Sequence, residues 1–578
     1  MGGKGVVRHP AASGVGLGVV RAPIVGARPI RRDNGAPMPP ITPEESPLPA
    51  LKPRPPRWAA LEPLKLPVFR MLWTTWLIAN VCMWMNDVAA AWMMTTLTTS
   101  PVWVALVQSA STLPVFLLGL PSGALADILD RRRWLVATQF WLAGTAVLLC
   151  AAIALDWMTA PLLLVLTFAN GIGLAMRWPV FAAIVPELVP RTQLPAALGL
   201  NGISMNASRI IGPLTAGVLI ASAGSVWVFA LNAVLCVVSG FVVLRWRREH
   251  RPHPLGRERL VSAMRVGVQF VRQSPRMRAV LVRIAIFFLH STALLALLPL
   301  LARGLRGGGA GTFTLLLASM GAGAITAVLV MPRLRQAFGR DQLVMRGAAL
   351  QSAATAVMAV APSAWVAVPA MFLGGAAWIT TANSLSVSAQ LALPDWVRAR
   401  GMAMYQMAIM GASALGAALW GQVAELSTLR TSLLVAAASG VLVMALAIRR
   451  VTDHTGEDDV SPAQAGWSAG PPPEAPSESG HVVVTVEYII DPARAAAFHV
   501  VMQQTRRARL SEGAIGWELL HDVAQPERYV EQIVDESWTE HRRRYTRATA
   551  ADMALRERRL AFHQGEELPV VTRYVVSR

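Results

Sequence analysis

The amino-acid sequence predicts an all-α membrane protein, with twelve transmembrane helices in two six-helix halves, followed by a small soluble α+β domain. Three observations lead to this prediction. Hydrophobic residues make up 54% of the 578 residues and charged residues only 15%, whereas soluble domains are usually about one-quarter charged. Apolar runs long enough to cross a bilayer recur from residue 71 to residue 448. After residue 480 the pattern changes to short strands and helices.

The composition also excludes other classes of protein. Cys82, Cys150 and Cys236 are too few to form a disulfide framework, and all three lie within apolar runs. The formal net charge of +19 could indicate nucleic-acid binding. In so apolar a chain it instead favours basic cytoplasmic loops. We therefore expect the lipid bilayer as a partner, and no nucleic acid.

The chain begins with a tail, residues 1–57, that is rich in Pro, Gly and Arg. Gly14, Gly16 and Gly18 interrupt its only apolar stretch, so we expect no cleaved signal peptide. We predict a disordered, basic, Pro-rich cytoplasmic tail.

Two groups of six apolar runs follow, within residues 58–251 and residues 278–451. The runs are continuously apolar and do not alternate, which favours helices over a β-barrel. The predicted spans are residues 71–96, 102–125, 134–155, 161–186, 197–222, 226–246, 278–302, 311–332, 343–361, 364–390, 401–424 and 430–448.

Every second loop between these runs is basic. The loop after the second span carries Arg131–Arg133, whereas the loop at Thr96–Pro101 carries no charge. Arg303, Arg306 and Arg430 are the exceptions. Because basic loops face the cytoplasm, we predict a multi-pass protein of the cell (inner) membrane with both termini cytoplasmic.

A cytoplasmic linker, residues 252–277, joins the two halves. Within it, Leu260, Met264, Val268 and Val271 recur at helical spacing among arginines. This pattern predicts an amphipathic helix that lies on the inner leaflet.

The composition changes again after the last span. Residues 452–480 are rich in Asp, Glu, Ser, Gly and Pro and read as a flexible linker. The last domain, residues 481–578, predicts a ferredoxin-like β-α-β-β-α-β order. Its expected elements are a strand over 481–489, a helix over 492–511, strands over 514–524 and 527–537, a helix over 539–563 and a strand over 568–577.

The two membrane halves repeat a pattern. An offset of 204 residues maps Pro190 to Pro394, Gly212 to Gly416 and Gly217 to Gly421. Each segment is a Pro-bearing cytoplasmic turn followed by a helix rich in small residues. Parallel halves of six helices are the architecture of the major facilitator superfamily.

Specific motifs carry the resemblance to that superfamily. Gly123 to Asp127, followed by Asp130 to Arg133, is similar to its signature loop between spans two and three. Ile128 and Asp130 depart from the usual pattern, which has an arginine and a glycine at those places. Ser208–Gly217 resembles a signature of exporters in the fifth span, with Ala216 in place of one glycine.

Shorter runs, among them those at Trp92–Met94 and Pro394–Arg400, resemble the branch that includes the bacterial enterobactin exporter.

In the last domain, Glu536-Ser537-Trp538 followed by His541 resembles the dimeric α+β-barrel monooxygenases of antibiotic biosynthesis. We expect a dimerising or regulatory module there rather than an active enzyme.

The resemblance implies a gate in the loop between spans two and three. It would consist of Gly123, Asp127, Asp130, Arg131 and Arg132. An acidic group at the membrane surface can pair with a basic one or cap a facing helix, and so hold one conformation closed. The alternative is a solvated loop without a gating role. Gly212, Pro213 and Gly217 would let the fifth helix bend and another backbone approach closely. Ordinary close packing of helices is the alternative, and the two roles are compatible.

Three ionisable residues lie at membrane depth: Asp87, Arg177 and Arg209. Such groups are costly unless they face water or a partner. Asp87 is our candidate for a protonatable coupling residue, and the alternative is a permanent ion pair with one of the arginines. Thr167 stands where many proton-coupled exporters carry an arginine. His290 could also titrate, although a membrane histidine is more often a hydrogen-bonded packing residue.

Polar and aromatic residues in the spans could line a cavity for an amphipathic ligand, or could serve as contacts between helices. The candidates are Trp84, Trp92, Gln108, Asn206, Trp378 and Asn383.

These observations predict a secondary-active exporter of a small amphipathic, siderophore- or drug-like molecule, working by alternating access with protons as the coupling ion. The chain has no phosphate-binding loop of the ATPase type, and we expect no cofactor, no metal site and no catalytic residue. A transporter fused to an active enzyme and a membrane sensor that does not transport are the alternatives.

Overall fold

The computed structural model describes residues 17–20, 59–128, 130–190, 192–246, 260–450, 459–461 and 480–576. The chain divides into two compact units. The membrane unit comprises Pro56–Met264 and Pro275–Gly456, and the soluble unit comprises Met1–Pro55, Arg265–Ser274 and Glu457–Arg578.

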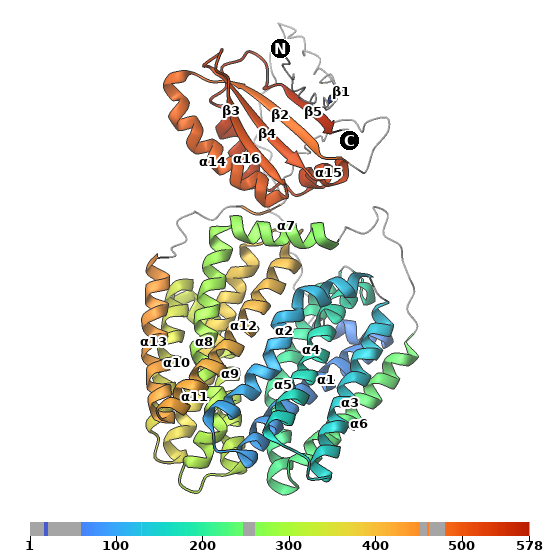
Figure 1. Ribbon diagram of the computed structural model, residues 1–578, viewed down its shortest axis with the longest axis vertical. Helices are drawn as coiled ribbons and strands as arrows, with labels where there is room; N and C mark the ends of the chain where they lie inside the picture. Colours follow the sequence, from blue (N-terminus) through green and yellow to red (C-terminus); the bar gives the residue numbers. More distant parts are fainter. Residues whose placement is uncertain are drawn as a thin grey trace, which may run out of the picture. The chain divides into compact units, whose positions relative to one another are not determined.

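Each of the predicted spans is a helix (Figure 1), and twelve helices of the described chain are long and apolar enough to cross a membrane. A short 3-10 helix, η1 (Ala59–Lys65), precedes them. The spans are α1 (Pro67–Leu97), α2 (Pro101–Ile128), α3 (Arg131–Ala154), α4 (Ala160–Leu188), α5 (Leu194–Ser222), α6 (Ser225–Arg245), α8 (Pro275–Gly304), α9 (Ala310–Ala337), α10 (Arg340–Val360), α11 (Ala364–Leu391), α12 (Arg398–Leu426) and α13 (Leu429–Arg450).

Local signals in the sequence set the ends of several helices. Pro67 occupies the first position of α1, where its missing N–H costs nothing. Asp130 caps α3, because its carboxylate accepts a hydrogen bond of 2.9 Å from the Arg133 N–H. Gly224, with φ of 96°, makes the turn between α5 and α6 that other residues would adopt only with strain.

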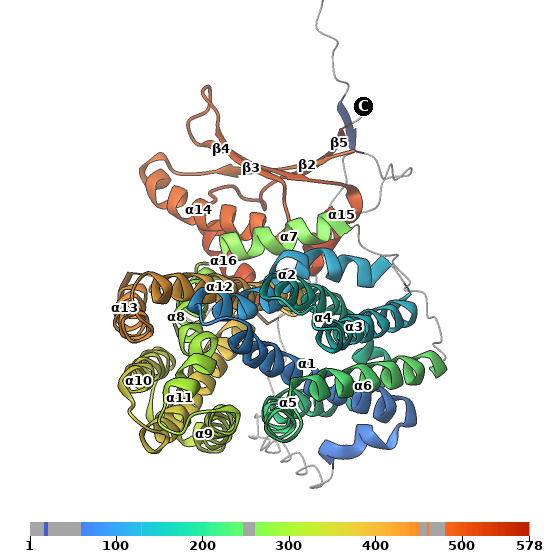
Figure 2. The ribbon, with the colours of Figure 1, turned by 60° about the horizontal axis from the view of Figure 1, so that its bottom comes forward.

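Helices α1–α6 form one half and α8–α13 the other (Figure 2). The repeated glycines explain how each half packs. A Cβ atom added to Gly212 of α5 would lie 2.5 Å from Cβ of Trp84 in α1. A Cβ atom added to Gly416 of α12 would collide with the carbonyl oxygen of Leu289 in α8. The first and fifth helices of each half therefore approach closely at equivalent positions.

The second pair of repeated glycines lies between the halves. Gly217 of α5 packs against Thr314 of α9, and Gly421 of α12 packs against Ala105 of α2. The fifth helix of each half thus contacts the second helix of the other. The sequence repeat corresponds to a structural repeat.

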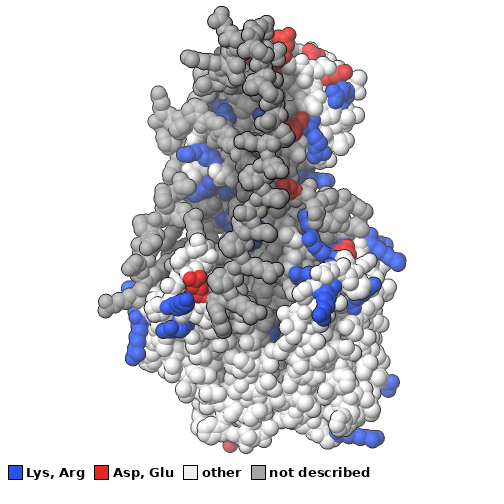
Figure 3. Space-filling view, turned by 180° about the vertical axis from the view of Figure 1, so that it is seen from behind, with Lys and Arg blue, Asp and Glu red and all other residues white. Residues whose placement is uncertain are grey.

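The helices alternate in direction, so every second loop lies at the same end of the membrane unit. The turns α2–α3, α9–α10 and α11–α12, which carry the clustered arginines, share one end, here called the basic end. Figure 3 shows Lys and Arg gathered near one end of this unit and a broad surface without charged side chains beyond it. This distribution is what a bilayer requires of a spanning protein.

The soluble unit contains an antiparallel sheet in the order β1-β5-β2-β4-β3. Its elements are β1 (Leu17–Val20), β2 (Val482–Ile489), η2 (Pro492–Arg494), α14 (Ala495–Glu512), β3 (Gly516–His521), β4 (Arg528–Asp535), α15 (Trp538–Thr546), α16 (Ala550–Leu560) and β5 (Val571–Val576). The predicted β-α-β-β-α-β order is confirmed. The predicted helix over 539–563 is two helices, because Thr549 and Asp552 form a capping box that starts α16.

Strand β1 was not predicted. It comes from the N-terminal tail and pairs antiparallel with β5, where Leu17 faces Val576. The tail residues around β1 lie outside the described part of the chain.

Alternate residues of β2 and β4 are buried, and helices α14–α16 pack on one side of the sheet (Figure 2). Tyr488, Phe498 and Met502 form the centre of that core. The other face of the sheet carries residues such as Val483, Thr485 and Val534, which are half-buried.

Most of the linker helix α7 (Leu260–Gln273) belongs to the soluble unit, which takes in Arg265–Ser274. Arg265 forms an ion pair of 2.6 Å with Glu536, and the Gln269 amide donates a hydrogen bond of 2.7 Å to the Ala514 carbonyl. Val266 is fully buried and lies against Gly513. We expected the apolar face of this helix to lie on the inner leaflet. Val266 was not among the residues of that predicted face, and of those residues Val268 is 38% exposed.

Candidate transport site

A cavity of about 620 Å³ lies between the two halves of the membrane unit. Helices α1, α2 and α5 of the first half and α8, α9 and α11 of the second line it. The lining is mostly apolar, with few polar side chains, as in sites for drug-sized ligands. Its side-chain lining includes Trp84, Asp87, Val88, Gln108, Ile203, Arg209, Ile210, Pro213, Leu295, Phe313, Leu317, Met320, Leu329 and Trp378.

The cavity brings together one acid and one amide of the predicted set. The Asp87 carboxylate accepts a hydrogen bond of 2.9 Å from the Ser111 hydroxyl. Gln108 lies one helical turn before Ser111 on α2, so both face the same side. The side-chain amide of Gln108 forms no hydrogen bond with another described residue. Asp87 and Gln108 are therefore available to a ligand or to water.

Arg209 of α5 also lines the cavity. Its guanidinium lies 4.5 Å from the ring centre of Trp378 and 5.6 Å from that of Trp84. Within the described chain, no carboxylate lies within 4.0 Å of it, and its buried Nε has no hydrogen-bond partner. The predicted ion pair between Asp87 and Arg209 is thus not formed in this structure.

Arg177 lies elsewhere, in the interior of the first half. Only 1% of its surface is exposed, and its guanidinium donates a hydrogen bond of 3.4 Å to the Ala79 carbonyl. It lies 5.2 Å from the ring centre of Trp76, which stacks on Phe181. Asp87 forms no ion pair with Arg177 either. Arg177 fills a packing position and does not line the cavity.

Contacts between the halves close one end of the cavity, opposite the basic end. Trp92 and Phe313 stack with ring centres 5.6 Å apart, and Arg303 lies 5.0 Å from the Trp92 ring. The Ser100 hydroxyl donates a hydrogen bond of 2.6 Å to Glu425. The predicted cavity residue Trp92 therefore belongs to this closure.

Toward the basic end, α5 and α9 separate. Gly321 of α9 still lies close to Ile210 of α5, but nothing lies within 4 Å of a Cβ atom added to Gly202. Ile203 is 57% exposed and Leu329 is 73% exposed, and both line the cavity. The cavity is therefore open between α5 and α9 on the side of the basic loops.

The remaining predicted site residues lie outside the cavity. Asp130 caps α3, and Arg132 donates a hydrogen bond to the Leu244 carbonyl at the end of α6. Both contacts join the turn between α2 and α3 to helices of the first half, α3 and α6. Asn383 accepts a hydrogen bond of 3.5 Å from Arg335.

Other predictions cannot be placed. The side chains of Asp127 and Asn206 lie outside the described residues, and Gly123 has a described backbone only. Arg131 stands at the first position of α3.

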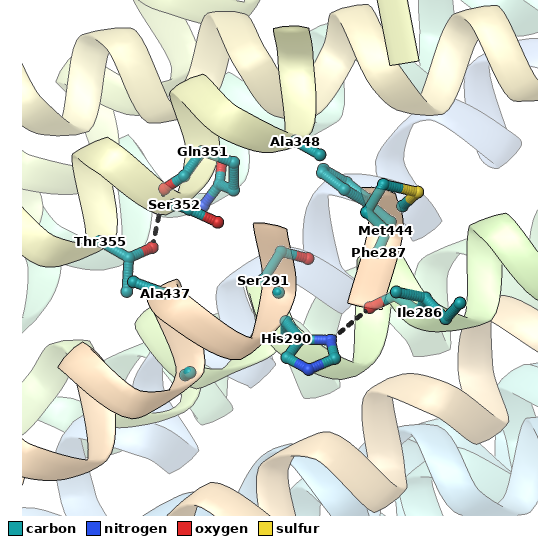
Figure 4. Close-up of a pocket in the computed structure, with 12 residues that line it drawn as sticks. Ile286, Phe287, His290, Ser291, Ala348, Gln351, Ser352, Thr355, Ala437 and Met444 are labelled. Carbon is teal, nitrogen blue, oxygen red and sulfur yellow. Dashed lines mark hydrogen bonds between the residues drawn. The ribbon is translucent and has the colours of Figure 1, made fainter. Parts of the chain in front are cut away.

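His290 lies in a second, much smaller pocket among α8, α10 and α13 (Figure 4). Its Nδ1 lies 2.7 Å from the Ile286 carbonyl oxygen. The pocket has a volume of about 10 Å³, which is room for about one water molecule. This geometry fits the packing interpretation of His290 and leaves it outside the large cavity.

Sequence reasoning missed Ser111 and every residue that α9 contributes to the cavity. The spacing of Gln108 and Ser111 by three residues was a signal for a shared helix face. Phe313, Leu317 and Met320 look like any other apolar residues in a span. Only the packing of α9 across from α1 and α5 identifies them.

In the soluble unit, charged side chains fill the space between sheet and helices. Glu531 of β4 accepts hydrogen bonds from Trp517 at 3.0 Å, Tyr488 at 3.1 Å and Arg509 at 3.2 Å. Burial opposes ionisation of Glu531, but Arg509 and Arg559 outweigh it and lower the pKa of Glu531 to about 2. Glu531 and Arg509 are therefore an ionised pair within a buried hydrogen-bond network.

The histidines noted in this unit have partners of their own. The His541 imidazole lies 2.7 Å from the Asp535 carboxylate, and burial lowers the pKa of His541. His521 stacks on Tyr529 and bonds to the Pro526 carbonyl. Among the described residues, no group of three or more His, Cys, Asp or Glu could hold a metal ion.

Comparison with known proteins places this chain in a family. A family model described as "Transmembrane secretion effector" matches residues 58–578, so it includes the soluble domain. The staphyloferrin A transporter of Staphylococcus aureus is 22% identical over 258 residues, which are 44% of this chain and 64% of that protein. The macrolide efflux protein A of Streptococcus pyogenes is 26% identical over 178 residues, 30% of this chain and 42% of that protein. The chain thus spans less than two-thirds of the length of either relative.

The nucleoside transporter NupG has the same fold in its crystal structure. It superimposes with a TM-score of 0.53 and 14% sequence identity, and covers 67% of this chain and 99% of its own. The family match over residues 58–578 agrees with the fold, which has twelve candidate spans in two similar halves. The chain therefore belongs to the transmembrane secretion effector family of major facilitator superfamily transporters.

Proposed function

We propose that this protein is a secondary-active exporter of a small amphipathic molecule and that it works by alternating access. The cavity between the halves carries the proposal. It is large enough for a drug-sized ligand, lies where both halves meet, and is closed at one end and open at the other. The similarity to a staphyloferrin A transporter and to a macrolide efflux protein supports siderophore- or drug-like substrates.

Proton coupling through Asp87 is the second part of the proposal. Asp87 is the carboxylate among the cavity's lining residues, and its hydrogen bond comes from a neutral hydroxyl and not from a cation. A carboxylate without a cationic partner can exchange a proton when the cavity opens to water on either side. Protons moving inward would then drive the ligand outward.

The site would face the cytoplasm in this structure. The cavity is open toward the basic loops, and basic loops face the cytoplasm of a bacterial inner membrane. We propose that location, with both termini cytoplasmic. We retain the enterobactin-exporter-like branch as the proposed subfamily, on the motifs described above.

For the soluble domain we propose a dimerising or regulatory role. One face of its sheet carries half-buried residues with no helix of this chain across it, as Figure 2 shows for the described elements. A second copy could cover that face. The light-scattering mass of a fragment of residues 480–578 tests this: a dimer is expected, and a monomer at high concentration would contradict it. Turnover of a polycyclic substrate would instead favour the monooxygenase-like alternative.

Expression of the chain in a bacterium without its own major efflux pumps tests the exporter proposal. We expect lower intracellular accumulation of macrolides or of a siderophore, and loss of that effect in an Asp87→Asn variant present at equal amount in the membrane. A strain indistinguishable from the empty host across both compound classes would contradict export.

A further inference from the structure

The cavity contains a cation, Arg209, to which the described residues supply no carboxylate partner. A guanidinium has five N–H donors and no acceptor. Arg209 finds no carboxylate within 4.0 Å, and its buried Nε donates to no acceptor, among the residues that the structure describes. Buried cations are normally paired, because an unpaired one is costly at membrane depth. The missing acceptor is therefore expected to come from outside the protein.

Two tryptophans hold this guanidinium in place. Trp84 comes from the first half and Trp378 from the second, and both rings lie within cation–π distance. Aromatic faces attract a cation but accept no strong hydrogen bond. The two rings hold the Arg209 side chain in place but accept no hydrogen bond from its N–H groups. These N–H groups therefore remain available to a ligand. Arg209 is thus held by two aromatic contacts, unlike an arginine on a flexible surface.

The rest of the cavity defines the other end of the ligand. Gln108 and Asp87 supply polar atoms, and the remaining lining side chains near them are aliphatic or aromatic, such as Leu295 and Phe313. A ligand that satisfies all of these groups has an anionic end, an apolar body and a polar group that can bond to an amide or a carboxylic acid.

We propose that Arg209 is the anion-binding group of the cavity and that the transported molecule carries a carboxylate on an apolar body. A carboxylate matches the planar fork of a guanidinium through two parallel hydrogen bonds. This inference rests on the proposed transport function for the identity of the molecule, but the binding site itself does not depend on transport. Because Trp84 and Trp378 come from different halves, an anion bound here touches both.

Three probes that share one ring system test the charge preference: naphthoate, naphthylmethylamine and naphthylmethanol. Their binding to the full chain in lipid nanodiscs is measured by calorimetry. We expect naphthoate to bind at least about tenfold more tightly than the amine or the alcohol, which corresponds to about 1.4 kcal/mol. A tighter amine, equal affinities or no binding of the acid would contradict the proposal.

Variants assign the preference to Arg209. Arg209→Gln should abolish it, and Arg209→Lys should keep it at reduced strength, because a lysine retains the charge without the planar fork. Arg306→Gln, at an exposed arginine outside the cavity, is the matched control and should bind as the wild type does. Unchanged affinity of naphthoate for a folded Arg209→Gln variant overturns the assignment. If Arg209→Gln does not fold, two other results decide the assignment. These are the affinity of Arg209→Lys for naphthoate and the order of the three probe affinities for the wild type.

This test can fail independently of the exporter proposal. A wild type that prefers the acid but moves no substrate would contradict export and leave the anion site intact. Active export of neutral or cationic compounds, undisturbed by Arg209→Gln, would contradict the anion site and leave export intact.

Discussion

At the scale of single residues, the sequence singled out three ionisable residues within apolar spans but not their surroundings. Asp87, Arg177 and Arg209 are recognisable because ionisable residues are rare in apolar spans. Whether they pair depends on helix rotations that one sequence does not reveal. The structure places Asp87 and Arg209 in one cavity and buries Arg177 among the aromatics of the first half.

This difference leads to a prediction for Asp87→Asn. Since no cation lies within 4.0 Å of Asp87 in the described chain, neutralising it strands no buried charge. The asparagine oxygen can still accept the Ser111 hydrogen bond, so we expect a melting temperature in detergent close to that of the wild type. The double variant Asp87→Asn/Arg209→Gln should show additive changes. A large destabilisation by Asp87→Asn that the second change reverses would reveal an ion pair.

A second prediction concerns the buried Glu531 in the soluble domain. Its pKa is lowered to about 2 from an ordinary value of 4.5. The ionised group therefore stabilises the fold fully above about pH 4.5, and this stabilisation is lost as the pH falls toward 2. Thermal melting of residues 480–578 should show that loss. Glu531→Gln should reduce stability at neutral pH by about 1–3 kcal/mol, because Arg509 loses the closer of its two carboxylate partners and keeps Glu512 at 3.7 Å.

The control for Glu531 is Glu518→Gln, at an exposed carboxyl of β3. It should keep the acid sensitivity of the wild type. An unchanged pH profile in Glu531→Gln would show that the charged network does not contribute as described.

At the scale of elements, length and apolarity were enough to place the twelve spans, because the bilayer fixes both. The amphipathic helix α7 lies within the predicted linker, residues 252–277. An apolar helix face looks the same in sequence whether lipid or protein covers it. In the structure, Val266 lies against Gly513 and Arg265 pairs with Glu536, so protein covers this part of α7.

Glycines at helix crossings give the third prediction. Gly416→Ala would place a Cβ atom against the backbone carbonyl of Leu289, so α12 and α8 must move apart. We expect a clear fall in the melting temperature. Gly144→Ala is the matched control in α3, where nothing lies within 4 Å of the added atom. It should be neutral or stabilising by up to about 1 kcal/mol, from helix propensity. Equal effects of the two changes would contradict the described packing.

At the scale of the whole molecule, the sequence repeat predicted two similar halves, and the glycine contacts between first and fifth helices confirm it. The cavity was not predictable in the same way. Its lining comes from six helices, and the contribution of α9 carries no polar marker in the sequence. A cavity defined by the absence of side chains leaves little signal in the residues around it.

Membrane topology provides the fourth prediction. The alternation of basic and uncharged loops requires Ser100 and residue 251 to lie on opposite sides of the membrane. Alkaline phosphatase fused after Ser100 should be active, and the same reporter fused at residue 251 should be inactive. Equal activity from the two fusions would contradict the twelve-span arrangement.

The most direct test of the proposed function is flux driven by a pH gradient in proteoliposomes, measured with the same exported compound for the wild type and for Asp87→Asn. The wild type should move the compound against its concentration gradient when protons flow the other way. Asp87→Asn should bind the compound and remain folded, but should only let it equilibrate. A folded Asp87→Asn protein with unchanged uphill flux would contradict proton coupling through the cavity carboxylate.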